Sequence, residues 1–332
     1  METVNRSISA DLIKTISIFG AVFIHSFGIL CNLSNFSIDI THMFRFGVPA
    51  FLVLWAYFFE TSYNRKNKSE RFTYLTQRFT HLFKVYIIWS AVYFIAIANW
   101  DVSFLKNITM YFAGFGFSGQ YFLIILFQLL LVHPLLRYLY FNKTLRIITI
   151  LIIAVLYILY GYFEFLLPNI LLKIGERAFL FWIPSVFVGI AMVHGKMIKI
   201  PLVMAVSILL IPLESSILHQ FNYHHFNHIT PIVLISSILF CVSIMQKEHL
   251  IKTKLKKVSH RVLTYIATHT IVIFILNPMI IVFLLKFNFF NYFHFSYLEN
   301  LIAGSVMTII ITFFCLAVGE FFQKIGLEKI VF

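Results

Sequence analysis

Residues 144–163, TLRIITILIIAVLYILYGYF, contain a single charged side chain, Arg146, among twenty residues. A helix needs about 20 predominantly apolar residues to cross the hydrocarbon core of a bilayer. This segment therefore predicts a membrane-spanning helix. Nine further apolar runs, separated by polar or charged breaks, occur at 7–30, 44–63, 82–100, 120–141, 178–195, 199–215, 229–246, 264–286 and 299–322.

The composition of the whole chain points the same way. Of its 332 residues, 60% are hydrophobic and 12% are charged, whereas soluble domains carry about 25% charged residues. A soluble enzyme, a disordered regulator and a secreted disulfide scaffold are excluded, the last because Cys31, Cys241 and Cys315 are too few and too scattered. We predict an all-α polytopic membrane helix bundle of about ten transmembrane helices, with residues 1–332 forming a single integral membrane domain.

The basic residues predict the orientation of these spans. With the N-terminus placed in the cytoplasm, 20 of the 26 Lys and Arg residues fall in cytoplasmic segments and four in outer loops. Cytoplasmic loops of membrane proteins carry an excess of Lys and Arg, so both termini are predicted to be cytoplasmic. The same bias explains the net charge of +13 without a nucleic-acid partner, and membrane lipid is the expected surrounding.

The first apolar run carries three ionisable residues. Lys14 and His25 are eleven residues apart, which places them about 20° from the same helix face. Asp11 precedes Lys14 by three residues and can pair with it. A charge at bilayer depth costs at least ~2.5–3.5 kcal/mol, so this face is expected to meet protein or water. Alternatively, Asp11 and Lys14 snorkel to the cytoplasmic surface and His25 caps the outer end of the helix.

Two further places bring basic residues to the ends of spans. Arg45, followed by Gly47 and Pro49, indicates a broken start to the second span whose freed backbone lines a cavity, or an interfacial arginine that reaches lipid headgroups. Arg78 and His81 lie at the cytoplasmic start of the third span. Such cations bind a phosphorylated cofactor or simply anchor the helix.

Taken together, these motifs resemble the acyltransferase-3 family of integral membrane O-acyltransferases, which modify bacterial surface glycans. The family signature in the first helix is a basic residue, ten spacers and a histidine, and Lys14 and His25 match it. The segment 44–57 is similar to the second helix of the family. Arg78 stands where the family carries the first arginine of an Arg-x-x-Arg motif, and His81 replaces the second.

Two more segments bear on this resemblance. Gln120 and Tyr121 lie in a stretch that resembles the fourth helix of the family. Gln120, Gln128 and the leucine-rich run that follows resemble the branch that acylates poly-N-acetylglucosamine. The ninth helix of the family commonly ends in Tyr-Leu-x-His-Pro, whereas here Asn277 precedes Pro278. Because asparagine cannot take up a proton, an acid–base role of that family histidine is absent here or has moved. We interpret the Asn-Pro pair as a kink.

The resemblance implies transfer of an acetyl or succinyl group from cytoplasmic acyl-CoA to a hydroxyl of a cell-surface polysaccharide or its lipid-linked precursor, at the bacterial cytoplasmic membrane. It implies that His25 acts as a base toward the sugar or as a transient acyl carrier. The residues expected to contribute are, for catalysis, His25, Lys14 and Asp11 and, for binding, Arg45, Arg78, His81, Gln120 and Tyr121. No metal is expected. The expected partners are lipid, the surface or lipid-linked glycan, and proteins of glycan synthesis or export.

Other interpretations remain open at this point. A polysaccharide exporter or flippase would use the polar face of the first helix to line its path, and a membrane sensor fits less well because no soluble output domain is present. His219, His224, His225 and His228 cluster in one outer loop, but their spacing is no established zinc pattern. Glu320, near the cytoplasmic end of the last span, is expected to be structural.

Overall fold

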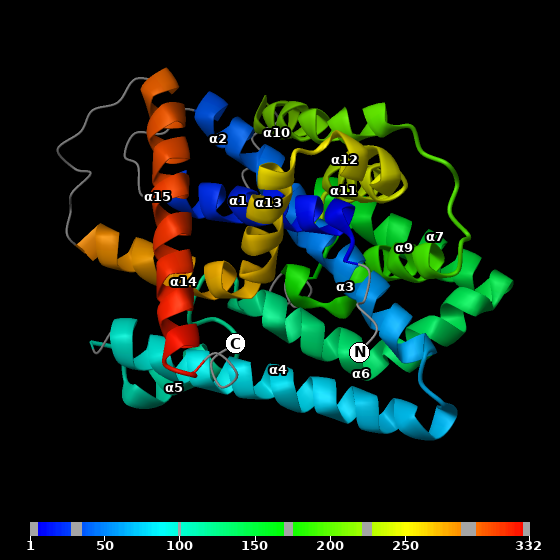
Figure 1. The fold of residues 1–332 in the computed structure, drawn as a ribbon, viewed down its shortest axis with the longest axis horizontal. Helices are drawn as coiled ribbons and strands as arrows, with labels where there is room; N and C mark the ends of the chain where they lie inside the picture. The colour runs from blue at the N-terminus through cyan, green and yellow to red at the C-terminus, as the bar shows by residue number, and fades with distance from the viewer. Residues whose placement is uncertain are drawn as a thin grey trace.

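The computed structural model describes residues 6–27, 35–98, 101–168, 175–220, 228–286 and 297–327. Within these ranges the regular structure is helical, without strands (Figure 1). The principal helices are α1 (Ile8–Phe27), α2 (Asn35–His42), α3 (Gly47–Asn64), α4 (Lys68–Ile97), α5 (Phe104–Phe112), α6 (Gln120–Phe141), α7 (Lys143–Tyr162), α9 (Ile183–Val193), α10 (Leu210–Gln220), α11 (Pro231–Met245), α12 (Glu248–Lys254), α13 (Lys257–Thr268), α14 (Thr270–Lys286) and α15 (Tyr297–Lys324).

Each of the expected spans corresponds to a helix or to a pair of helices. In the described part of the chain, seven helices are long and apolar enough to cross a membrane, and two bent pairs, α11 with α12 and α13 with α14, raise the number to nine if each pair is one span. The remaining predicted span is a shorter apolar helix, Phe179–Val193. The prediction of an all-α polytopic membrane bundle is confirmed.

The first helix lies inside the bundle. α1 packs against α3, α13, α14 and α15 (Figure 1), so its polar face meets other helices. α3 and α9 also approach closely: a Cβ atom on Gly189 would lie 2.5 Å from the Cβ of Ala56 and 2.8 Å from the carbonyl oxygen of Val53. Small residues permit such close contact between membrane helices.

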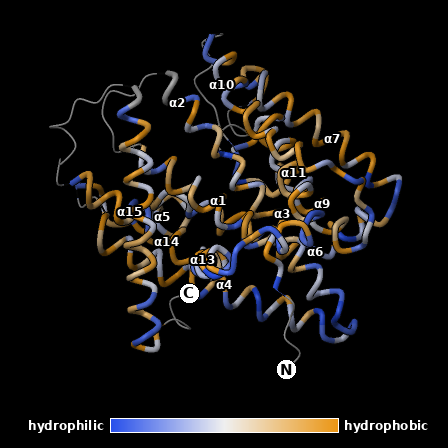
Figure 2. The backbone as a smooth tube through the Cα atoms, turned by 45° about the horizontal axis from the view of Figure 1, so that its top comes forward, coloured by the Kyte–Doolittle hydropathy of each residue, from blue (hydrophilic) through white to orange (hydrophobic). Residues whose placement is uncertain are grey.

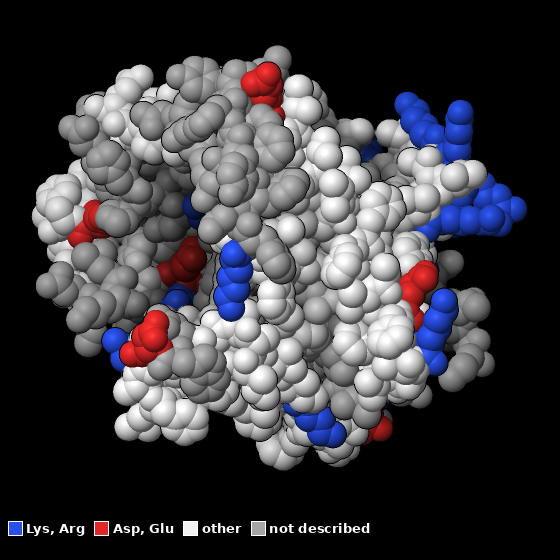
Figure 3. Space-filling view, turned by 90° about the vertical axis from the view of Figure 1, so that its left-hand side faces the viewer, with Lys and Arg blue, Asp and Glu red and all other residues white. Residues whose placement is uncertain are grey.

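Other helices turn apolar faces outward. Leu151 on α7 is 60% exposed and Phe313 on α15 is 66% exposed. Figure 2 shows hydrophobic residues along the middle of the long helices and hydrophilic residues at several of their ends. On the face drawn in Figure 3, charged side chains gather at one edge or are scattered, and a broad area of the described residues between them is uncharged. Contiguous exposed apolar surface of this extent requires lipid around it.

The helix expected at 82–100 starts much earlier than predicted. α4 begins at Lys68, where Asn67 and Glu70 form a capping box. This pairing satisfies orphan amide groups at the helix start, so the charged segment before the apolar run is helical rather than a loop. Phe72 in this extension is 77% exposed. Arg78 therefore lies within a continuous helix that leads into the span.

The start of α1 is fixed by a carboxylate from another helix. Glu248 accepts hydrogen bonds from the amides of Ile8, at 2.8 Å, and Ser9, at 2.9 Å, and from the hydroxyl of Ser7, at 2.7 Å. A carboxylate at the positive end of a helix stabilises that end and satisfies its free amides. This contact sets the position of α1 and of the polar residues along it.

Candidate active site

Three side chains from different parts of the chain meet at the last turn of α1. Nδ1 of His25 lies 2.7 Å from Oδ1 of Asn277 on α14. Nε2 of His25 lies 3.0 Å from Oγ of Ser118, in the loop that precedes α6. The imidazole is therefore held between a helix of the C-terminal half and a loop at the end of the bundle predicted to face outward.

Asn277 also determines which nitrogen of His25 carries the proton. Pro278 has no amide proton, so it cannot donate to the carbonyl of Phe274 in the usual helical pattern. Nδ2 of Asn277 donates to this oxygen at 2.9 Å and to the carbonyl of Ile273 at 2.7 Å. With both amide protons used, Oδ1 faces His25 as an acceptor, and Nδ1 of His25 must be the donor. Nε2 is left as the basic nitrogen.

The loop that carries Ser118 is fixed by the side chain of Gln120. Its Oε1 accepts a hydrogen bond from the amide of Gly116 at 2.8 Å, and its Nε2 donates to Oγ of Ser90 at 2.9 Å and to the carbonyl of Tyr111 at 2.6 Å. Gln120 is fully buried. Gln120 is predicted to bind substrate, but in the structure its side-chain amide is hydrogen-bonded within the protein, where it positions the loop.

Packing on either side of Ser118 restricts the loop further. Gly119 has a φ of +86°, a conformation that favours glycine. A Cβ atom there would lie 2.9 Å from the ring of Phe274. On the other side, Phe117 stacks on Tyr93 with ring centroids 3.8 Å apart. These contacts hold the hydroxyl of Ser118 against α14 and α1.

A cavity of about 440 Å³ lies on the side of the bundle predicted to be cytoplasmic, among α1, α3, α4, α6, α13 and α14. Lys14 and Arg78, two of the site residues predicted from the sequence, both line it. Nζ of Lys14 lies 4.9 Å from the ring centroid of Phe58, and Cζ of Arg78 lies 5.2 Å from that of Tyr74. Neither cation forms an ion pair with a described acidic side chain. The cavity thus offers two positive charges to an anionic ligand.

Aromatic side chains line part of this cavity. Phe51, Phe122 and Phe274 line it, and Phe122 contacts the other two rings with centroids 6.4 Å and 5.4 Å away. Phe274 lies about one helical turn before Asn277, and Phe122 follows Ser118 by four residues. The aromatic wall is therefore about one turn away from both partners of His25.

A second polar group lies near His25, at the ends of the spans that are predicted to face outward. His228 donates from Nδ1 to the carbonyl of Arg45 at 3.2 Å, its amide donates to Glu176 at 3.2 Å, and its ring centroid lies 6.1 Å from that of Tyr121. Burial lowers the pKa of His228 to about 4, with Glu176 opposing and Arg45 reinforcing the shift. His228 is therefore neutral at pH 7. Arg45 and Tyr121, both predicted site residues, share this location.

Asp11 does not pair with Lys14 as expected. Its Oδ2 lies 2.6 Å from Nε of Arg6 and its Oδ1 lies 3.2 Å from Nη2 of the same residue. Arg6 also donates to the carbonyl of Thr264 at 2.9 Å. Asp11 therefore ties the start of the chain to α13, and Lys14 is left to face the cavity.

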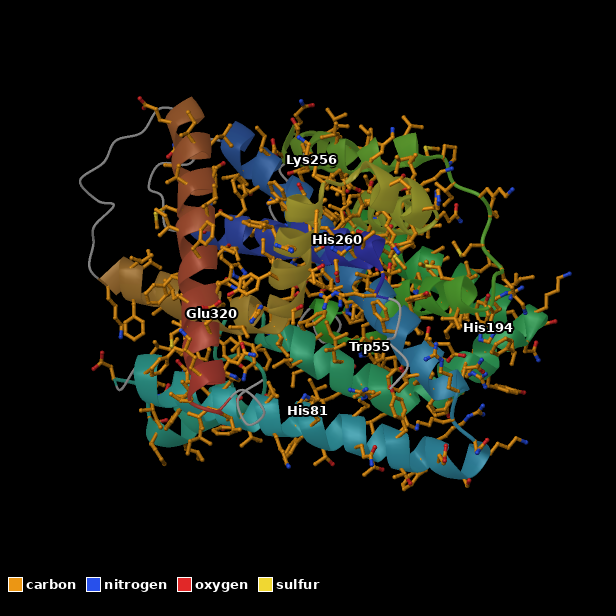
Figure 4. All side chains as sticks on the ribbon, viewed as in Figure 1. Trp55, His81, His194, Lys256, His260 and Glu320 are labelled. Carbon is orange, nitrogen blue, oxygen red and sulfur yellow. The ribbon has the colours of Figure 1, made fainter. Side chains whose placement is uncertain are left out.

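His81 lies apart from the other predicted site residues. Together with Lys84 it lines a separate surface groove of about 490 Å³ along α4. Figure 4 shows His81 on this long helix and Trp55, a residue of the cavity wall, on a different helix. Arg78 and His81 are only three residues apart, but Arg78 lines the cavity and His81 lines the groove. The structure therefore does not place them on one ligand.

The outer histidine loop is only partly described. His224 and His225 lie outside the described residues; His219 is 2.8 Å from Asp39 and His228 lies beside Arg45. Within the described ranges, no group of three His, Cys, Asp or Glu side chains is placed to hold a metal ion.

Glu320 accepts a hydrogen bond from the hydroxyl of Tyr265 at 2.6 Å, a contact between α13 and α15.

Comparison with known proteins identifies a family. The sequence model of one family, described as an acyltransferase domain, matches residues 7–318, nearly the whole chain. The matched range contains His25, Asn277, Ser118, Lys14 and Arg78. No curated protein and no solved structure matches the chain.

Proposed function

The chain belongs to the acyltransferase-3 family and is a membrane acyltransferase; from this premise we propose that it transfers an acetyl or succinyl group from acyl-CoA to a hydroxyl of a surface polysaccharide or its lipid-linked precursor. The observation that carries the proposal is the position of His25. Its basic Nε2 lies next to a hydroxyl, at 3.0 Å, and the residues that hold it are about one turn from the aromatic wall of a cavity that Lys14 and Arg78 also line.

The residues at the cavity suit the donor. Lys14 and Arg78 present positive charge to the phosphates of CoA, and the apolar walls suit its pantetheine arm. A donor held in this way directs its thioester toward the aromatic wall of Phe51, Phe122 and Phe274, and so toward His25. The acceptor hydroxyl arrives from the other side, where Arg45 and Tyr121 lie.

The chemistry assigned to His25 is general base catalysis. Imidazole is the side chain best matched to proton transfer at neutral pH. Nε2 takes the proton of the attacking hydroxyl, and Asn277, which accepts the Nδ1 proton at 2.7 Å, keeps the imidazole in the required tautomer and orientation. The imidazolium formed in this step then gives its proton to the leaving thiolate. Arg45 supplies positive charge on the outer side, where the carbonyl oxygen becomes anionic.

The test measures ester groups on the surface glycan. A deletion strain of the source bacterium is complemented with the wild type, with His25→Ala or with His249→Ala, an exposed histidine on α12, at matched membrane levels. We expect proton NMR of the glycan to show esters with the wild type and His249→Ala. With His25→Ala we expect the esters to fall by about 10²–10⁴-fold while glycan still reaches the surface. Unchanged esters with reduced surface glycan would instead indicate an exporter.

A further inference from the structure

The contact between Ser118 and His25 has a second consequence. We propose that Ser118 is the nucleophile that carries the acyl group between donor and acceptor, as an ester on its Oγ. The inference rests on the proposed function, since it assigns an intermediate to that same transfer. It makes Ser118, His25 and Asn277 one catalytic unit.

The three side chains have the geometry of an activated nucleophile. In such units a hydroxyl lies within hydrogen-bond distance of a base, and a third group orients the base. Oγ of Ser118 lies 3.0 Å from Nε2 of His25, and Nδ1 lies 2.7 Å from Oδ1 of Asn277. Because Nδ1 is the donor to Asn277, Nε2 accepts the proton of Ser118. The hydroxyl is thus already aligned for proton transfer in the absence of any substrate.

The surroundings of Ser118 suit an acyl carrier. The residue is exposed, so its hydroxyl can meet a substrate. It immediately precedes Gly119, the N-terminal cap of the 22-residue helix α6, so an oxyanion formed on its acyl group lies near the positive end of that helix. The aromatic cavity wall includes Phe122, four residues further along the chain, and Phe274, which packs on Gly119.

The covalent route has two balanced half-reactions. In the first, Nε2 of His25 takes the proton of Ser118 while Oγ bonds to the thioester carbonyl carbon; the carbon–sulfur bond breaks, and the CoA thiolate leaves with the proton from the imidazolium. In the second, the acceptor hydroxyl gives its proton to Nε2 and attacks the ester carbonyl. Oγ of Ser118 leaves and takes that proton back. The net reaction converts a thioester and an alcohol into an ester and a thiol.

An intermediate also solves a problem of access. The donor reaches the site through the cavity lined by Lys14 and Arg78, and the acceptor comes from the opposite side of the bundle. With the acyl group on Ser118, CoA leaves before the glycan binds, and the two substrates need not occupy the site together. The bundle then never has to open to both sides at once.

Isotope exchange tests the proposal without knowledge of the acceptor. The purified full-length protein in detergent is incubated with acetyl-CoA or succinyl-CoA and labelled free CoA, and the label entering acyl-CoA is measured. We expect exchange by the wild type and by Ser305→Ala, whose hydroxyl bonds to the carbonyl of Leu301 in its own helix. Ser118→Ala is expected to lose at least 100-fold of the exchange at unchanged thermal stability. Mass spectrometry should place the acyl group on Ser118 in the wild type.

A second variant keeps the test decisive if Ser118→Ala does not fold. Ser118→Cys retains a nucleophile, and its acyl group becomes a thioester that neutral hydroxylamine cleaves much faster than the wild-type ester. Wild-type exchange rates in Ser118→Ala would overturn the proposal. So would a wild type that neither exchanges nor becomes acylated while glycan esters still require His25; transfer is then direct and the proposed function stands. If the glycan esters do not require His25 either, both ideas fail.

Discussion

Substitutions of Asn277 test how the site is built, because the oxygen and the nitrogen of its side-chain amide have different partners. Its Oδ1 accepts from His25, and its Nδ2 donates to the carbonyls of Ile273 and Phe274. Asn277→Asp keeps an acceptor toward His25 and loses the donors. Asn277→Leu, of similar size, loses both. The pair of variants therefore separates the orientation of the imidazole from the repair of the helix at Pro278.

The magnitudes follow from these three hydrogen bonds. Each contributes about 0.5–1.5 kcal/mol net, and a buried carbonyl left without a donor adds a penalty of about 1–3 kcal/mol. Both variants should therefore lower thermal stability, because both leave the carbonyl of Phe274 without its donor. Activity should differ. Asn277→Leu frees His25 to adopt the other tautomer and should lose about 10²–10⁴-fold in acyl transfer, the range of a general base, whereas Asn277→Asp should stay within about tenfold of the wild type.

The assay is release of CoA from acetyl-CoA in membranes that contain each variant and the acceptor glycan, with folding checked by thermal unfolding of the purified proteins in detergent. Rates are compared at a temperature where all three proteins are folded. Equal loss of activity in the two variants would refute the argument that Asn277 acts by fixing the tautomer. So would full activity in Asn277→Leu.

Three further predictions address the surroundings of the site. Lys14→Met and Arg78→Met should each raise KM for acetyl-CoA by about 10–100-fold with little change in kcat, as expected for loss of a charge-assisted contact of ~1.5–3 kcal/mol; His81→Ala, in the separate groove, should not. Gly119→Ala should lower both stability, by about 1–2 kcal/mol for the left-handed conformation, and transfer, measured by unfolding and CoA release. The folded-state pKa of His228 is about 4 against an ordinary 6.5, so the folded protein binds fewer protons than the unfolded chain between these values. The stability that His228 contributes should thus be complete above pH 6.5 and fall as the pH drops toward 4, and His228→Gln should flatten this part of the curve of Tm against pH.

The spans could be predicted because they depend on composition alone. An apolar run of about 20 residues is sufficient to indicate a helix in lipid, and the predicted runs coincide with described helices or bent pairs. The predicted run 82–100 omits the first part of α4, because the charged residues before it resemble a polar loop. Asn67 and Glu70 nevertheless carry the capping signal that places the start of the helix at Lys68.

The site was only partly predictable, for a physical reason. Lys14 and His25 stand out because ionisable groups at bilayer depth are costly. Ser118 and Asn277 are uncharged and carry no such signal. They lie 93 and 252 residues from His25 in the sequence, and only the fold brings them into contact with it. The Asn-Pro pair in an apolar run was a usable clue, since a proline inside a helix frees a carbonyl that a neighbouring side chain can satisfy. Interpreting this pair as a kink alone leaves out the hydrogen bond that Oδ1 of Asn277 accepts from His25.

The kink in α14 and the orientation of His25 are one feature. An asparagine in an unbroken helix has no carbonyl that needs its amide protons, so either end of its side chain could face a neighbouring histidine. Pro278 removes that freedom by leaving the carbonyl of Phe274 in need of a donor. Nδ2 supplies it at 2.9 Å, Oδ1 is turned toward His25, and the imidazole has to donate from Nδ1. A backbone defect in α14 thus leads, through one side chain, to a basic nitrogen placed 3.0 Å from a hydroxyl.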